Sequence, residues 1–183
     1  MNEPYEEADK YWSANAQAGI KAIRMYDSVH PIYVEGRAWS NTAIFPDLNG
    51  DLLSLHDPNN NLIYSAHLYL DEGSSGQYAK KITEPFDPMI GVNRAKPFVQ
   101  WLIRNKRKGH FGEFGVPGDD PRWLVAMDNL MAYLHENCVP LAYWAAGPWW
   151  GNYPLSVEPT NGVMPPQWPV LEKWIKMKSK SCS

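Results

Sequence analysis

The feature that most constrains the fold of this chain is a regular alternation of apolar, β-prone segments with amphipathic helical ones. Over residues 6–27, apolar or small residues such as Ala8, Trp12, Ala16 and Ile20 recur at helical spacing. Such an alternation is typical of a parallel sheet covered by helices, so we predict an α/β fold with about four parallel strands. Strands are expected at 32–36, 62–67, 110–114 and 141–146, and further helices around 95–103, from Asp120-Pro121 to Leu134, and at 169–178.

Composition and charge limit the class of protein. With 183 residues, 44% of them hydrophobic and 20% charged, the chain can bury the core of one globular domain, and no repeat or linker divides residues 1–183. The net charge of −3 argues against nucleic acid or an anionic membrane as a partner. No apolar run reaches the roughly 18 residues that span a bilayer. A globular domain is therefore the starting point.

Cysteine and histidine usage indicates no metal site. Cys138 and Cys182 have no metal-ligand spacing and are either free or paired; the position of Cys138 at the end of a helical stripe favours a buried free thiol. The five histidines follow no zinc-binding pattern, so no catalytic metal is expected.

Polar side chains stand where the predicted strands end. They are Glu35, His67, Tyr69, Glu113 and Trp144. In parallel α/β sheets, ligands bind beyond the carboxyl ends of the strands. This coincidence of position predicts a binding or catalytic site at that edge.

Two carboxylates near such an edge suit glycoside hydrolysis. Glu113 ends one strand, and Glu3, in Asn2-Glu3-Pro4, stands where a strand before the first helix would end. One carboxyl group protonates the leaving oxygen while the other attacks the sugar or activates water; a spacing of about 5–5.5 Å gives retention. Gly112 and Gly115 flank Glu113 and are expected to leave room for a substrate.

Four segments in order resemble glycoside hydrolase family 5. Met1–Pro4 resembles the Asn-Glu-Pro signature that closes strand four, and His67–Tyr69 the His-x-Tyr of strand six. Gly112–Gly115 resembles the nucleophile motif of strand seven, and Tyr143–Gly151 strand eight with its subsite tryptophan. The match covers the whole chain. It implies the C-terminal half of a (β/α)8 barrel, from the end of strand four through helix eight.

The resemblance also implies a retaining endo-β-1,4-glucanase that needs no cofactor, acts on cellulose and cello-oligosaccharides, and is secreted in the parent family, although no signal is visible here. Glu3 would be the acid/base and Glu113 the nucleophile. The other implied contacts are Tyr69 bonded to Glu113, His67 orienting the sugar or the acid, Asn2 at the 2-hydroxyl, Trp144 under the reacting sugar, and Trp39 with Trp149 or Trp150 as outer platforms.

Other interpretations remain open at this point. The family's first strands would precede Asn2, which suggests either a homodimer that completes the barrel or an incompletely cloned product. Such a chain could bind glucan without turnover, or act on mannan or a mixed-linkage glucan. Each side chain also has a simpler interpretation: Glu113 as a surface carboxylate, His67 as a core histidine, Tyr69 as a packed phenol and Trp144 as barrel filler.

Overall fold

The structure, a computed structural model, describes residues 1–177. The chain forms two compact units. Unit 1 consists of Met1–His67 with Lys96–His110, and unit 2 of Leu68–Ala95 with Phe111–Ser183. The prediction of one domain over residues 1–183 stays a prediction, and its last six residues, Cys182 among them, lie outside the described ones.

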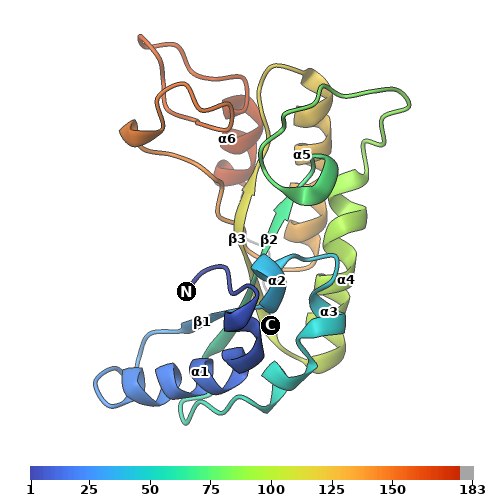
Figure 1. Cartoon of the computed structure of the whole chain (residues 1–183). Coiled ribbons are helices and arrows are strands. Elements are labelled where there is room, and N and C mark those ends of the chain that lie inside the picture. The colour runs from blue at the N-terminus through green and yellow to red at the C-terminus, as the bar shows by residue number, and fades with distance from the viewer. Residues whose placement is uncertain (178–183) are drawn as a thin grey trace. The chain divides into compact units, whose positions relative to one another are not determined.

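Unit 1 contains the first helix and the start of a parallel sheet (Figure 1). Helix α1 (Glu7–Arg24) carries acidic residues in its first turn and basic ones in its last, which complements the helix dipole. Strand β1 (Ile32–Glu35) pairs in parallel with β2 (Leu62–Tyr69), with Ile32 opposite Leu62 and Glu35 opposite Ser65. The predictions of a helix over 6–27 and of strands at 32–36 and 62–67 are confirmed.

An aromatic cluster forms the core of unit 1. Phe45, from the short helix α3 (Phe45–Leu48), lies 4.6 Å from Phe98 and 5.1 Å from Trp101, centroid to centroid. Both partners belong to α4 (Ile90–Asn105), and Trp101 also meets Tyr64 of β2 edge-on at 5.1 Å. Because these rings are buried, they fix α3 and α4 against β2. Two more short helices, α2 (Arg37–Ser40) and the 3₁₀ helix η1 (Gly50–Ser54), follow β1.

Unit 2 continues the sheet and adds two helices. Strand β3 (Lys108–Gly115) lies beside β2, which gives the sheet order β1-β2-β3. Asp120 caps α5 (Pro121–Glu136) by accepting a hydrogen bond from the Arg122 backbone N–H, as its sequence position predicts. Helix α6 (Trp168–Lys176) lies beside α5 (Figure 1). Two 3₁₀ turns, η2 (Glu72–Ser74) and η3 (Pro148–Trp150), lie in loops.

The fourth strand, predicted at 141–146, is only partly formed. Leu141 makes an isolated parallel bridge to Phe111, and the Trp144 N–H donates to the Phe114 carbonyl at 2.7 Å. Beyond Trp144 the chain leaves β3, because the Ala145 N–H donates to the Leu155 carbonyl and the Ala145 carbonyl accepts from Val157. The described residues therefore contain three named strands and one segment that runs along β3 in the place of the fourth.

The interpretation of Cys138 as a buried free thiol is wrong. Cys138 is exposed, follows the end of α5 with a φ of 57°, and is disulfide-bonded. The helical stripe ends one turn earlier, at Leu134, which is buried. Among residues 1–177 no helix has the length and apolar character required to cross a bilayer.

Candidate active site

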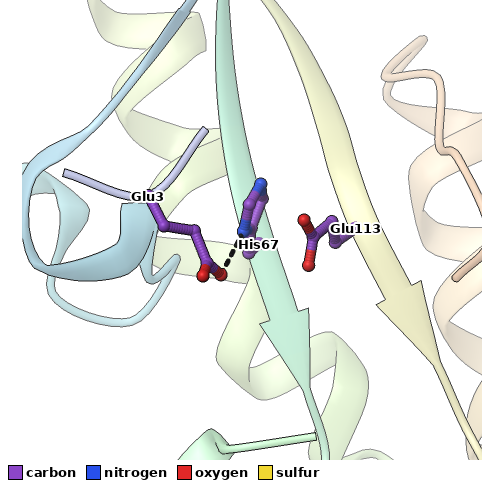
Figure 2. Close-up of side chains that lie close together, drawn as sticks. All are labelled: Glu3, His67 and Glu113. Atoms are coloured by element: carbon purple, nitrogen blue, oxygen red, sulfur yellow. Dashed lines mark hydrogen bonds and ion pairs between the residues drawn. The ribbon is translucent and has the colours of Figure 1, made fainter. Parts of the chain in front are cut away.

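Glu3 in unit 1 is hydrogen-bonded to His67. The Glu3 Oε1 atom lies 2.9 Å from the His67 Nδ1 atom, as Figure 2 shows. The segment before α1 is held in place by the neighbouring Pro4, which is buried and whose carbonyl accepts from the Trp39 N–H at 3.0 Å. Asn2 is exposed beside Glu3. The predicted acid is therefore anchored through a side chain of β2 and through backbone.

His67 faces a second carboxylate. Its imidazole is buried, and its Nε2 atom lies 3.6 Å from Glu35 Oε2, at the end of β1. His110 belongs to the same surroundings: burial lowers its pKa, and the neighbouring His67 imidazole lowers it further. The sequence placed Glu35 at a strand end, but it gave no role to that residue. The signal that could have identified Glu35 was the expected parallel pairing, because it brings the ends of β1 and β2 together.

An aromatic pair stands near this group in unit 1. The rings of Tyr5 and Trp39 are stacked, with centroids 3.6 Å apart and planes inclined by 19°. Trp39 is 48% exposed, so the ring has a face that a ligand can reach. The sequence predicted Trp39 as an outer platform but missed Tyr5, which supports the Trp39 ring. A flat, exposed indole is a surface on which a sugar ring can pack.

Glu113 in unit 2 accepts a hydrogen bond from a phenol. The Tyr69 hydroxyl, from the end of β2, donates to Glu113 Oε2 at 2.9 Å. Glu113 extends from β3 (Figure 2) and is half-buried, whereas Tyr69 is buried. A phenol ordinarily ionises near pH 10, so at neutral pH it donates to the carboxylate and stabilises its charged form. This hydrogen bond was expected for the pair, and it is present.

The strand ends that carry Tyr69 and Glu113 are tied together by Tyr78. Its hydroxyl donates to the Gly115 carbonyl at 2.6 Å and accepts from the Leu70 N–H at 3.0 Å. Burial raises the pKa of Tyr78 well above its usual value, so the phenol stays neutral. No sequence motif indicates this contact, because Tyr78 lies in a loop.

Gly115 has a different role from the one predicted. A Cβ at this position would lie 2.1 Å from the Trp144 carbonyl oxygen, so the glycine admits the neighbouring chain segment. The space expected for a substrate at Gly115 is therefore occupied by the backbone of Trp144.

The predicted tryptophans of unit 2 differ in their surroundings. Trp144 and Trp150 contact each other at 4.8 Å, and Trp150 also packs against Tyr153 at 5.1 Å. Burial raises the pKa of Tyr153, and the charge of Glu113 raises it further. Trp149 is 92% exposed and lies at the tip of η3. Trp144 and Trp150 thus form one aromatic cluster, which Trp149 does not join.

These arrangements permit two kinds of chemistry. A carboxyl group that is hydrogen-bonded to an imidazole has a neighbour that can accept or return a proton, which suits a general acid/base. A carboxylate that accepts a hydrogen bond from a phenol is held in one orientation, which suits a nucleophile.

Comparison with known proteins gives consistent matches. Residues 1–149 match the family described as cellulase (glycosyl hydrolase family 5). A probable endo-β-1,4-glucanase B from Aspergillus oryzae is 35% identical over 167 residues, covering 88% of this chain and 49% of the relative. Endo-β-1,4-glucanase B from Emericella nidulans is 36% identical over 151 residues, covering 80% and 44%. This chain spans about half the length of the relatives it matches.

A solved structure is similar over the whole chain. The endoglucanase Cel5A of Pseudomonas stutzeri, in complex with cellobiose, is 45% identical with a TM-score of 0.93. That match covers 100% of this chain and 54% of the solved one. The likeness thus extends from the sequence to the three-dimensional arrangement.

Proposed function

The chain belongs to glycosyl hydrolase family 5, and on that premise we propose that it carries the catalytic residues of a retaining endo-β-1,4-glucanase. The prediction of an α/β chain that forms about half of a (β/α)8 barrel is confirmed, because the chain covers 54–55% of the endoglucanase structures most similar to it here. The substrate class rests on relatives that are named endo-β-1,4-glucanases and on a relative solved with cellobiose.

Hydrolysis proceeds by double displacement. Glu113 attacks the anomeric carbon, while Glu3 donates a proton to the leaving glycosidic oxygen. Glu3 then removes a proton from the water that cleaves the glycosyl-enzyme bond, so the anomeric configuration is retained. This mechanism requires the two carboxyl groups about 5–5.5 Å apart on either side of one bond. Asn2, Trp144, Trp39, Trp149 and Trp150 are the proposed sugar contacts.

The observation that carries the proposal is the hydrogen bond from Tyr69 to Glu113. A nucleophile must be aimed at the reacting carbon, and a phenol that donates to one carboxylate oxygen fixes the direction of the carboxylate. The bond from Glu3 to His67 supports the complementary role, because an imidazole partner can accept or return a proton.

Two substitutions test the assignment. Glu113→Gln is expected to abolish hydrolysis of carboxymethyl-cellulose. Glu3→Gln is expected to slow it by about 10²–10⁴-fold, the usual contribution of a general acid. With an aryl cellobioside whose leaving group needs no proton, Glu3→Gln should lower the rate of the first step only slightly. Glu172→Gln, which changes an exposed carboxylate paired with Lys176, is the matched control. Full activity of Glu113→Gln would overturn the mechanism.

A binding protein without turnover is the rival function. It is supported by the exposed indoles of Trp39 and Trp149, on which a sugar ring can pack without being cleaved. Calorimetry with cellotetraose, run beside a reducing-sugar assay, separates the two: heat of binding without new reducing ends supports the rival. The same assay on mannan and on mixed-linkage glucan tests the related hydrolases.

Assembly and export complete the proposal. Strand β1 is at the edge of the three-stranded sheet that the described residues form, and its Tyr33 is half exposed. Exposed edges attract partner strands, so the chain pairs with a second copy. Light scattering on an eluting peak tests this, and a monomer contradicts it.

The disulfide at Cys138 fits an exported protein, because such bonds persist in oxidising compartments. A thiol reagent that labels Cys138 in the purified protein without reductant would contradict the disulfide, and with it this argument for export.

A further inference from the structure

The buried imidazole of His67 lies between two carboxyl groups of unit 1. Glu3 Oε1 is 2.9 Å from Nδ1, and Glu35 Oε2 is 3.6 Å from Nε2. The His67 side chain is 4% exposed, the Glu35 side chain 14% and the Glu3 side chain 37%. Glu35 thus meets the ring from the protein interior, and Glu3 meets it from the side that solvent reaches.

We propose that Glu35 is a positioning residue that acts on Glu3 through His67, by holding the imidazole proton on Nε2. Nδ1 is then an acceptor, and Glu3 keeps its carboxylic proton in a hydrogen bond to that atom. This inference rests on the proposed acid/base role of Glu3. Glu35 itself does not touch the substrate.

The reason lies in how protons are distributed over the three groups. A neutral imidazole has one donor and one acceptor nitrogen, and an ionised carboxylate only accepts. If Nδ1 carried the only ring proton, the Nε2 lone pair would face the Glu35 carboxylate in a buried site, where like polarity is costly. With the proton on Nε2, the ring presents its positive edge to Glu35. The separation of 3.6 Å is longer than a normal hydrogen bond, so the effect is electrostatic.

The alternative distributions do not serve a general acid. An imidazolium between two carboxylates has the same total charge as the proposed distribution, but it leaves Glu3 ionised before the glycosidic bond breaks. A protonated Glu35 also leaves Glu3 ionised. Among these three distributions, the one with an ionised Glu35, a neutral His67 and a protonated Glu3 gives Glu3 a proton to donate. Moving that proton between Glu3 and Nδ1 changes no net charge.

Two further contacts of unit 1 belong to the surroundings of this pair. His110 contacts the Ser65 hydroxyl at 3.5 Å, and burial lowers its pKa, so it stays neutral beside His67. The Trp12 indole N–H donates to the backbone carbonyl of Glu35 at 2.7 Å. This bond fixes the backbone of Glu35 while leaving its carboxylate directed at the ring.

The test is the tautomer of His67, read by nitrogen-15 NMR on the whole chain labelled at histidine. The His67→Gln variant assigns the signal among the five histidines. We expect a protonated Nε2 and an unprotonated Nδ1. In Glu35→Met, which has similar length and no charge, the proton should move toward Nδ1. Glu7→Gln, at an exposed carboxylate paired with Lys10, should leave the spectrum unchanged.

Kinetics provide a second readout. Glu35→Met should lower turnover about 10-fold for substrates with poor leaving groups, a fraction of the 10²–10⁴ that a general acid supplies, and spare good leaving groups. A merely structural role would lower both equally. A wild-type ring protonated on Nδ1, a doubly protonated ring, or an unchanged tautomer in Glu35→Met overturns the inference. A wild-type chain that turns over neither substrate overturns the proposed function instead, and the NMR result still decides on Glu35.

Discussion

The two units stabilise their buried polar groups by different means. In unit 1, buried charges face opposite charges: the Arg24 guanidinium forms a bidentate pair with Asp57, at 2.7 and 2.9 Å, with both side chains almost fully buried. In unit 2, the buried side chains of Asp71 and Tyr78 have neutral hydrogen-bond partners. Asp71 accepts from the Ser75 hydroxyl and from two backbone N–H groups, and Tyr78 joins Leu70 to Gly115.

The same contrast applies to the two carboxyl groups proposed for catalysis. Glu3 of unit 1 has an ionisable partner in His67, whereas Glu113 of unit 2 has a phenol that stays neutral. A group that exchanges its proton in each catalytic cycle benefits from the first environment, and a group that must remain ionised benefits from the second. The difference teaches that the partner of a carboxylate, more than the carboxylate itself, sets its role.

The largest effect on stability is expected from breaking the buried ion pair. Asp57→Asn leaves the Arg24 charge without its counter-ion, which costs about 3–5 kcal/mol. Chemical denaturation measures the loss, and hydrogen exchange locates it in unit 1. The exposed Asp47→Asn is the control. If the amides of unit 2 lose protection equally, the contrast between the units is wrong.

A smaller effect is expected in unit 2. Tyr78→Phe removes the hydroxyl that serves the Leu70 N–H and the Gly115 carbonyl, and leaving such groups unsatisfied costs about 1–3 kcal/mol. Faster exchange of the Leu70 amide would localise the loss. Tyr26→Phe, at a side chain that is 90% exposed, should change nothing. An unaltered Leu70 amide would show that the phenol does not join these strand ends.

The smallest effect is expected from lowering the pH, which should destabilise the two units at different places. The bond to Arg24 lowers the pKa of Asp57, and hydrogen bonds from the backbone N–H groups of His30 and Val29 lower the pKa of Asp27 to about 2. Carboxyl groups with a lowered pKa bind fewer protons when folded, so their stabilisation is complete above the unfolded value of about 4. It is lost as pH falls through the folded pKa.

Between about pH 4 and 2, unit 1 should therefore lose hydrogen-exchange protection around Asp27 first. Asp57 should stay ionised to a lower pH than Asp27. In unit 2 the surface pair of Asp120 with Arg122, which lowers the pKa of Asp120 to about 2, should loosen the start of α5. The Leu70 amide, held by a neutral phenol, should not respond. A response there over this range would contradict the distinction.

The sequence by itself determined the local elements and the positions of polar side chains at the strand ends. The Asp120-Pro121 cap, the helix over 6–27 and the apolar strands were predictable because their signals are carried by neighbours along the chain. Glu3, His67, Tyr69 and Glu113 were selected from motifs, and the Tyr69–Glu113 hydrogen bond joins the ends of the neighbouring strands β2 and β3.

The tertiary structure decided the features that depend on distant partners. Glu35 lies beside His67 because β1 and β2 pair in register, and Gly115 is needed because Trp144 approaches its backbone. The fourth strand stops short because Ala145 pairs with the segment around Leu155, and the exposed Cys138 is bonded instead of buried. A hydrogen bond between residues far apart in sequence leaves no periodic signal along the chain, so these outcomes became visible only once the strands and loops were placed.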